Sequence, residues 1–308
     1  MPTASDAVIL HQYDLSPFSE KIRKILAFKK AAWQAVTQSM WLPRPHLTPM
    51  TGAYRRIPVL QIGADVYCDT RLIARKLDEL MPEPPLYPRG LEAAADSITQ
   101  WADRHMFAAV VPQVFTELAA MLPPPLLEDR RKMRPDLDPT ALLASVPDLR
   151  NELRAFATAL ERTLGRGGFL LGPVFSVADA AVHHVLWFVR NAPEAGAILA
   201  RFPGIQRWLG EIDGMGQGQR EELTPEAALA IAAANEPRTL RTEDAADPNG
   251  LTPGTRVAIS SDDLPQDRVE GDVLALAPDE IVITRRSPEC GAIALHFPRA
   301  GYRIATLP

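Results

Sequence analysis

The pattern of hydrophobic and polar residues predicts an α/β domain over residues 1–84. Short apolar runs separated by turn residues are typical of buried strands, and apolar residues at helical spacing indicate helices. The expected strands are Ala7–Gln12, Trp33–Thr37, Arg56–Ile62 and Asp65–Tyr67. The first expected helix begins at Pro17 and has Glu20, Lys21, Arg23 and Lys24 on its polar face. The second covers about residues 70–81. The order β-α-β-β-β-α begins with a unit whose two strands should be parallel.

The pattern becomes purely helical after residue 90. No strand pattern occurs from Leu91 to about Met215, and helices are expected at 91–121, 148–164, 177–190 and 202–213. Residues 126–146 are polar and rich in proline, which favours a long loop or a short helix. An alanine-rich segment with good helix-start residues follows at Thr224–Asn235. Residues 91–235 are therefore expected to form an all-α domain.

A third pattern begins after the charged segment 236–250, which is expected to be a linker. Five short segments alternate in polarity or are rich in β-branched residues: Arg256–Ser260, Val269–Leu276, Glu280–Arg285, Ala292–Phe297 and Tyr302–Ile304. Five strands in so short a segment predict a small, barrel-like all-β domain over residues 250–308. We expect a chain without residues 241–308 to keep a folded core.

Composition narrows the functional classes. The net charge of −5 argues against a general nucleic-acid binder. Residues 1–90 carry 12 Lys and Arg against 8 Asp and Glu, which suits a small anionic ligand or arises by chance. The two cysteines form neither a CxxC pair nor a zinc spacing, so we expect no metal site. No apolar run has membrane-spanning length and Met1–Asp6 lacks a signal-peptide pattern, so we expect a cytoplasmic protein with no membrane partner.

Three local motifs carry candidate chemistry. Ser16 precedes Pro17 at the start of the first helix, where it either caps the helix or donates a hydrogen bond to a bound thiolate. Ile57-Pro58 lies inside an apolar strand, which indicates a cis peptide bond or, alternatively, a trans proline at a strand edge. Asp69-Thr70 precedes the second helix and either caps it or holds the charged ends of an amino acid.

Together these motifs resemble the thioredoxin-fold domain of glutathione transferases. The resemblance covers residues 7–90 and implies a catalytic hydroxyl at Ser16, binding of the glutathione cysteinyl backbone at Ile57 and Pro58, and binding of the γ-glutamyl end at Asp69 and Thr70. The family usually has Glu-Ser where this chain has Asp69-Thr70. The all-α domain adds Ser176-Val177-Ala178-Asp179, similar to the structural capping box of the family.

The same resemblance implies further site residues. Arg44, His46 and Arg55 lie before the Ile57-Pro58 strand, where the family binds the glycine carboxylate of glutathione. The alternative is that each is a solvated charge of the loop. Tyr13, Trp101, His105 and Met106 could line the pocket for the second substrate, or could be core residues instead.

The resemblance predicts a homodimeric glutathione transferase that conjugates glutathione, as co-substrate, to a small electrophile, a reaction typical of detoxification. The alternatives are a non-catalytic module that binds glutathione or another protein, and a glutathione-dependent isomerase or peroxidase. The sequence names no electrophile and assigns no role to residues 250–308.

Overall fold

The computed structural model describes residues 6–136 and 138–308, which divide into two compact units. The first unit comprises the residues up to Ser19, Ala32–Lys76 and Gln219–Pro308, and the second comprises Glu20–Ala31 and Leu77–Gly218. This division differs from the three consecutive domains expected at 1–84, 91–235 and 250–308. The C-terminal strands belong with the N-terminal strands, because both lie in one sheet.

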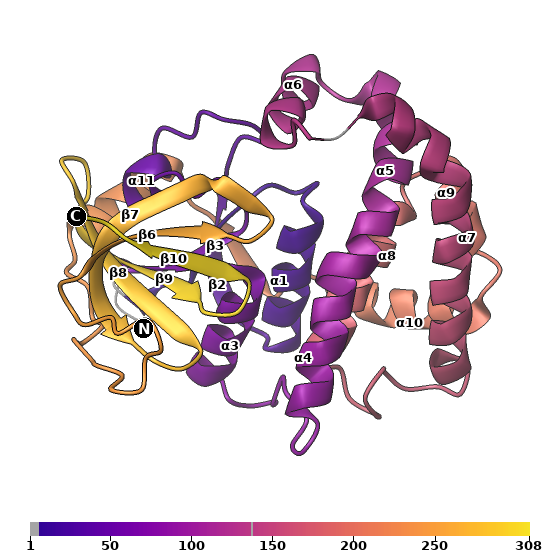
Figure 1. Cartoon of the computed structure of the whole chain (residues 1–308). Coiled ribbons are helices and arrows are strands. Elements are labelled where there is room, and N and C mark those ends of the chain that lie inside the picture. Colours follow the sequence, from indigo (N-terminus) through magenta and orange to yellow (C-terminus); the bar gives the residue numbers. More distant parts are fainter. Residues whose placement is uncertain (1–5, 137) are drawn as a thin grey trace. The chain divides into compact units, whose positions relative to one another are not determined.

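The first unit contains a ten-stranded sheet (Figure 1). Its order is β10-β6-β7-β8-β9-β4-β3-β1-β2-β5. The strands are β1 (Ile9–Gln12), β2 (Ala32–Thr37), β3 (Val59–Ile62), β4 (Asp65–Cys68), β5 (Gln219–Glu222), β6 (Arg256–Ser261), β7 (Leu264–Leu276), β8 (Glu280–Ser287), β9 (Gly291–Pro298) and β10 (Tyr302–Thr306). The five strands expected near the C-terminus are therefore present, and β7 begins five residues earlier than expected.

The C-terminal strands extend the N-terminal sheet. Strand β9 pairs in parallel with β4, so that Asp65 lies opposite Ala294 and Tyr67 lies opposite His296. The remaining C-terminal strands follow β9 as an antiparallel series that ends at β10. The expected C-terminal β extension is confirmed, but it is not a separate domain, because its strand β9 pairs with β4. A periodic pattern predicts a strand but not the neighbour with which that strand pairs.

One hydrophobic core joins the two groups of strands. Met50, Val66 and Cys68 from the N-terminal part are fully buried in the same cluster as Ile283 and Leu295 from the C-terminal part. Cys68 is a buried core residue, and burial raises the pKa of its thiol well above the usual value.

A buried polar cluster lies where β4 meets β9. The His296 ring stacks on Tyr67 with 4.1 Å between ring centroids, and its nitrogens lie 3.2 Å from Asp65 and 2.6 Å from Glu280. Burial opposes the charged imidazolium, but the hydrogen bonds to the two carboxylates prevail and raise the pKa of His296. Burial likewise opposes the charge on Asp65, yet its bonds with His296 and Thr239 lower the pKa of that carboxyl.

The second edge of the sheet holds a strand that was not expected. The segment Gln219–Glu222 pairs in parallel with β2, and most of its side chains are exposed. It has no apolar alternation, because a polar edge strand is held by backbone hydrogen bonds alone. Helix α11 (Pro225–Ala233) follows it, and the Gln61 side chain donates to the Ala228 carbonyl.

The second unit is helical. The Thr48–Thr51 turn, α2, belongs to the first unit, and α1 (Pro17–Phe28) and α3 (Thr70–Leu80) begin in the first unit and continue in the second. The other helices are α4 (Glu92–Gln100), the π-helix η2 (Trp101–Met106), α5 (Phe107–Leu118), the 3₁₀ turn η3 (Ala119–Met121), α6 (Pro124–Met133), α7 (Pro139–Leu164), α8 (Val177–Val189), α9 (Pro193–Leu199) and α10 (Pro203–Gly214).

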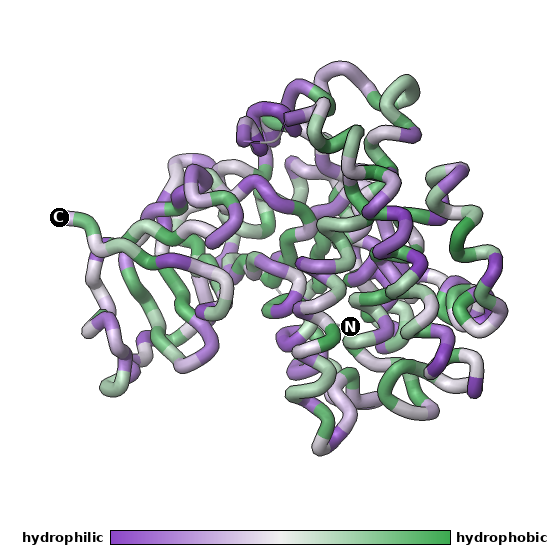
Figure 2. The backbone as a smooth tube through the Cα atoms, turned by 45° about the vertical axis from the view of Figure 1, so that its right-hand side comes forward, coloured by the Kyte–Doolittle hydropathy of each residue, from purple (hydrophilic) through white to green (hydrophobic). Residues whose placement is uncertain are grey.

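Several helical expectations need correction. Helix α9 was not expected, and the segment 126–146 consists largely of α6 and the first turns of α7. Helix α5 contacts both α7 and α8. Hydrophobic and hydrophilic segments alternate along the backbone (Figure 2). Within residues 6–136 and 138–308, no helix is both long enough and apolar enough to cross a membrane.

Asp179 anchors the start of α8. Its carboxylate accepts hydrogen bonds from the Ser176 N–H (3.0 Å), the Ser176 hydroxyl (2.8 Å), the Leu170 N–H (2.9 Å) and the Trp208 indole (3.0 Å). The expected structural role of the segment Ser176–Asp179 matches these contacts.

The polar face expected on α1 is buried. Glu20, Lys21, Arg23 and Lys24 are each at most 4% exposed. Lys21 pairs with Asp103 at 2.6 Å, and Glu20 pairs with both Arg23 and Lys24. Charged groups are tolerated inside a protein only when they are paired and hydrogen-bonded, and these contacts meet that condition.

We predict that a chain lacking residues 241–308 does not keep a folded core, contrary to the expectation from sequence. Removal of residues 241–308 would expose Met50, Val66 and Cys68 and leave the edge of β4 unpaired. Solubility and the near-ultraviolet circular dichroism of the truncated and full chains test this. A soluble truncated chain that unfolds cooperatively at the temperature of the full chain would contradict it.

We predict that the His296→Gln substitution destabilises the protein more at mildly acidic pH than at alkaline pH. The stability supplied by His296 is fully present below the usual pKa of 6.5 and is lost as the pH rises through its raised pKa. The Asp65 contribution is present above 3.8 and is lost as the pH falls through the lowered pKa of that carboxyl. The cost should be about 2 kcal/mol near pH ~5.5 and smaller near pH ~8.5.

Urea unfolding at the two pH values measures this difference. The exposed His105, changed to Gln, is the control and should have a small effect at both. An equal loss of stability at both pH values in His296→Gln would exclude the charged form of this histidine.

Candidate functional site

Three predicted site segments meet at one end of the adjacent strands β4, β3 and β1. His11 of β1 lies opposite Val59 of β3, and Val59 lies opposite Cys68 of β4. Because β3 is antiparallel to both neighbours, the end of β1, the start of β3 and the end of β4 are adjacent. Ser16 follows β1, Ile57 precedes β3 and Asp69 follows β4, each by only a few residues. The sheet therefore gathers the three motifs that sequence singled out.

Ser16 is buried and caps the first helix. Its hydroxyl oxygen accepts a hydrogen bond from the Ser19 N–H at 3.1 Å, and its own N–H donates to the Tyr13 carbonyl at 3.0 Å. The capping alternative is thus present. Capping uses a lone pair of the oxygen and leaves the hydroxyl hydrogen available. No acceptor for that hydrogen occurs in the described part of the chain.

The Ile57–Pro58 peptide bond is cis, as the motif suggested. Ile57 is largely buried but lies outside the strand that begins at Val59. Neither its N–H nor its C=O forms a backbone hydrogen bond with any residue that the structure describes. An extended peptide could therefore pair with both groups as a strand would.

Asp69 adopts an unusual backbone conformation and is held from three sides. Its φ of 76° lies in the left-handed region, and its carboxylate accepts from the Arg71 N–H at 2.9 Å. The Asp69 N–H donates to the Tyr54 hydroxyl at 3.0 Å, and the Tyr302 hydroxyl donates to the carboxylate at 3.3 Å. Burial raises the pKa of both tyrosines, so both hydroxyls keep their protons. Thr70 begins α3 beside this group and is mostly buried.

Sequence reasoning did not find Tyr302. It lies 233 residues from Asp69 along the chain and belongs to β10, at the far end of the strand order. The Arg71 guanidinium also donates to the Ala300 carbonyl in the turn before β10. No local pattern could have indicated these contacts, because they depend on how the C-terminal strands curve back toward the start of α3.

Arg44 and His46 have other partners. The Arg44 side chain is buried and donates to the Ser39 carbonyl at 2.8 Å and to the Arg55 carbonyl. His46 lies 3.1 Å from Glu226 of α11. These contacts hold the loop after β2, so neither side chain is presented as an open carboxylate site.

The residues expected around the second substrate have separate environments. Tyr13 is partly buried against the core of the first unit. In the second unit, Trp101 and His105 both meet the Phe156 ring edge-on at 5.4 Å, and His105 also pairs with Glu152. Met106 is fully buried. The last three residues lie in η2, and π-helical turns are frequent at functional sites.

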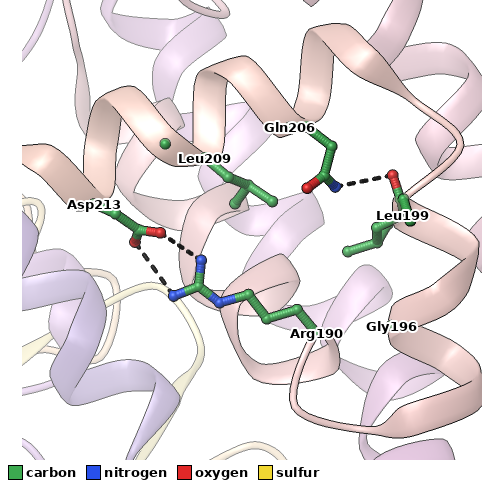
Figure 3. Close-up of a pocket in the computed structure, with 8 residues that line it drawn as sticks. Arg190, Gly196, Leu199, Gln206, Leu209 and Asp213 are labelled. Carbon is green, nitrogen blue, oxygen red and sulfur yellow. Dashed lines mark hydrogen bonds and ion pairs between the residues drawn. The ribbon is translucent and has the colours of Figure 1, made fainter.

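A hollow of about 350 Å³ lies between α8, α9 and α10 in the second unit. Figure 3 shows Arg190 facing Asp213 across it, and Gln206 donating to the Leu199 carbonyl at 3.0 Å. Burial alone would raise the pKa of Asp213, but hydrogen bonds from His183 and Arg190 lower it. The two charged side chains of the lining neutralise each other, which leaves the hollow without a free charge for a ligand.

The structure offers no cluster for a metal ion within residues 6–136 and 138–308, where no three His, Cys, Asp or Glu side chains gather suitably. The adjacent His183 and His184 are fully buried in α8, and burial lowers the pKa of both. His183 lies 3.2 Å from Asp213. Both histidines are therefore core residues of the helical unit.

Comparisons with known proteins agree with this architecture. The family model "Glutathione S-transferase, N-terminal domain" matches residues 10–85, and "Glutathione S-transferase, C-terminal domain" matches residues 100–211. A search of curated proteins finds no match.

Among solved structures, a GST-like protein from Pseudomonas syringae is 35% identical, with a TM-score of 0.82 over 98% of this chain and 100% of that chain. A glutathione S-transferase from Rhodospirillum rubrum F11 is 21% identical, with a TM-score of 0.54 over 67% and 87% of the two chains. FzlA from C. crescentus is 23% identical, with a TM-score of 0.52 over 75% and 94%. The last two show the fold alone and leave at least a quarter of this chain unmatched.

The similarity to the Pseudomonas syringae protein extends over nearly the whole chain, and the two family models together match more than half of it. The chain belongs to the glutathione S-transferase family.

Proposed function

We propose that this protein is a glutathione transferase in which Ser16 stabilises the thiolate of glutathione. The observation that carries the proposal is the Ser16 hydroxyl itself. It stands at the N-terminus of α1, its oxygen accepts from the Ser19 N–H, and its hydrogen has no acceptor in the described residues. Because the chain belongs to a family that binds glutathione, we take glutathione as the ligand of this site.

The chemistry follows from the electrostatics of a helix start. Unpaired N–H groups and the helix dipole favour an anion there, and a hydroxyl that donates to sulfur favours the thiolate further. The pKa of the bound thiol falls and its proton leaves to solvent. The thiolate then attacks an electrophilic carbon, so that a carbon–sulfur bond forms while the leaving group departs with its electron pair.

The segments at the ends of β3 and β4 would bind the rest of the glutathione molecule. The free N–H and C=O of Ile57 would pair with the cysteinyl backbone, beside Pro58. Asp69 would bind the γ-glutamyl ammonium, and Thr70 at the start of α3 would bind the carboxylate. Arg44 and His46 are omitted from this proposal because other groups hold them.

A non-catalytic glutathione-binding module is the second proposal. Two contacts favour it: Ser16 already caps its helix, and the Asp69 carboxylate already accepts from Tyr302 and Arg71. A glutathione-dependent isomerase or peroxidase would use the same site with another substrate. We further propose that the second substrate is a small electrophile, that the protein is a homodimer, as is usual in the family, and that it is located in the cytoplasm.

We predict that Ser16→Ala lowers kcat/KM for conjugation by about 30-fold, because one hydrogen bond to a charged sulfur contributes about 2 kcal/mol. The same substitution should raise the pKa of the bound thiol, which the thiolate absorbance of the complex reports. It should also cost about 1 kcal/mol of stability through loss of the cap.

Ser19→Ala is the matched control. Ser19 lies on the same helix, and its buried hydroxyl has no hydrogen-bond partner among the residues that the structure places, so its removal should leave turnover unchanged. If the wild type binds glutathione but turns over no electrophile, and Ser16→Ala binds equally well, the non-catalytic alternative replaces the transferase.

We predict that Asp69→Asn weakens glutathione binding by about 10-fold, because it removes the charge that faces the γ-glutamyl ammonium. An analogue in which a glutaryl group replaces the γ-glutamyl group lacks that ammonium. The wild type and Asp69→Asn should bind this analogue with equal affinity in titration calorimetry.

Asp279→Asn, which changes an exposed acid of the same unit, is the control and should leave both affinities unchanged. An equal loss for glutathione and for the analogue would show that Asp69 acts only through the backbone of the site.

A further inference from the structure

The outer strands of the first unit form a second, positively charged hollow. It has a volume of about 560 Å³ and is lined by Gly52 and Ala53 after α2 and by residues of β6, β7 and β8. Its charged lining consists of four arginines and two acids: Arg256, Arg268, Arg285, Arg286, Glu270 and Asp272. The glutathione site proposed above shares none of these residues.

The two acids are already engaged. Arg256 lies 3.5 Å from Glu270 and 3.4 Å from Asp272, and it is half exposed. Arg268, Arg285 and Arg286 have no acidic partner within ion-pair distance among the residues that the structure describes. Three of the four guanidinium groups therefore have no direct acidic partner in the described part of the chain, and four arginines against two acids leave the lining with a surplus of two positive charges.

Arg285 is the most unusual of the three. It continues the inward-facing row of β8 after Ile281 and Ile283, which are fully buried core residues. One of its terminal nitrogens, Nη1, is buried and has no hydrogen-bond partner within residues 6–136 and 138–308. Burial is the main cause of the lowered pKa of this guanidinium, and the neighbouring Arg256 lowers it further. A buried, unpaired charge costs free energy and is seldom kept without a partner.

Gly52 brings the backbone close to this guanidinium. Its φ of 61° lies in the left-handed region, and a Cβ at this position would be 2.5 Å from Arg285 Nη1. The absence of a side chain thus lets Arg285 lie directly over the chain after α2. This contact holds the guanidinium at the wall of the hollow instead of letting it extend into solvent.

We propose that this hollow binds a phosphate group, as a free ion or as part of a small phosphorylated molecule, with Arg285 as the central ligand and Arg268 and Arg286 around it. A guanidinium offers a planar pair of donors that matches two phosphate oxygens, and a dianion neutralises the surplus charge. Chloride carries one charge and has no pair of oxygens to match the two donors, so it should bind more weakly. The site needs no contribution from Ser16 or Asp69, so it stands independently of the proposed transferase activity.

Titration calorimetry of the full chain with inorganic phosphate and with methyl phosphate, at constant ionic strength set with chloride, tests this. We expect millimolar or tighter binding of at least one of the two, and a matching rise in Tm. Arg285→Met should weaken the binding by about 10-fold or more. It should unfold at the same or a higher temperature than the wild type in phosphate-free buffer, since it removes a partly buried charge that has no direct acidic partner in the described chain.

Two further variants keep the test decisive. Arg268→Gln combined with Arg286→Gln changes only exposed side chains and should also weaken phosphate binding. Arg303→Gln changes an exposed arginine of β10 outside the hollow and should bind phosphate as the wild type does. Failure of the wild type to bind either phosphate, or equal weakening in Arg303→Gln and Arg285→Met, would overturn the proposal, whatever the outcome of glutathione titrations.

Discussion

The parallel pairing of β4 with β9 is the contact on which the first unit depends. It makes one sheet from strands that are more than two hundred residues apart in sequence, and it buries Val66 and Cys68 beneath the C-terminal strands. His296 sits at this join with Asp65, Glu280 and Tyr67 around it. Because the pairing closes the outer edge of β4, the C-terminal strands are part of the N-terminal core and not a separable addition.

The same pairing shapes the candidate site. The series of strands that begins at β9 ends at β10, and this brings the Tyr302 hydroxyl to the Asp69 carboxylate. Tyr54 holds the Asp69 N–H from the N-terminal side. An aspartate is one methylene shorter than the glutamate usual in the family, and here hydrogen bonds from two distant parts of the chain fix its position. The residue proposed to bind the γ-glutamyl end is thus contacted by a part of the chain that lies outside both matched family models.

Two charged groups of the first unit, His296 and Arg285, show opposite environments for a charge that is removed from water. His296 is buried with two carboxylates, and these hydrogen bonds raise its pKa despite burial. Arg285 is partly buried with no acid within ion-pair distance among the described residues, and burial lowers its pKa. The carboxylates around His296 compensate its charge, whereas Arg285 lacks such a partner in the part of the chain that the structure describes, which is consistent with the proposed anionic ligand for Arg285.

Sequence determined the local features of this protein. The period of apolar residues located nearly all strands and the main helices, and the dipeptide Ile57-Pro58 identified the cis bond. Turn and helix-start chemistry placed Ser16 and Asp69 at helix beginnings, where the structure has them. These features depend on neighbours within a few residues, and such neighbours can be read directly from a sequence.

Tertiary structure alone decided which distant groups meet. The apolar alternation in β9 predicts a strand but does not identify β4 as its neighbour. The polar segment Gln219–Glu222 has no pattern typical of a strand. The residues near Tyr302 give no indication of its contact with Asp69. Lys21 and Arg23 were expected on an exposed face of their helix, yet both are buried, because acids such as Asp103 and Glu20 neutralise them there. The free energy of pairing and of charge burial belongs to groups brought together by folding, so no local pattern contains it.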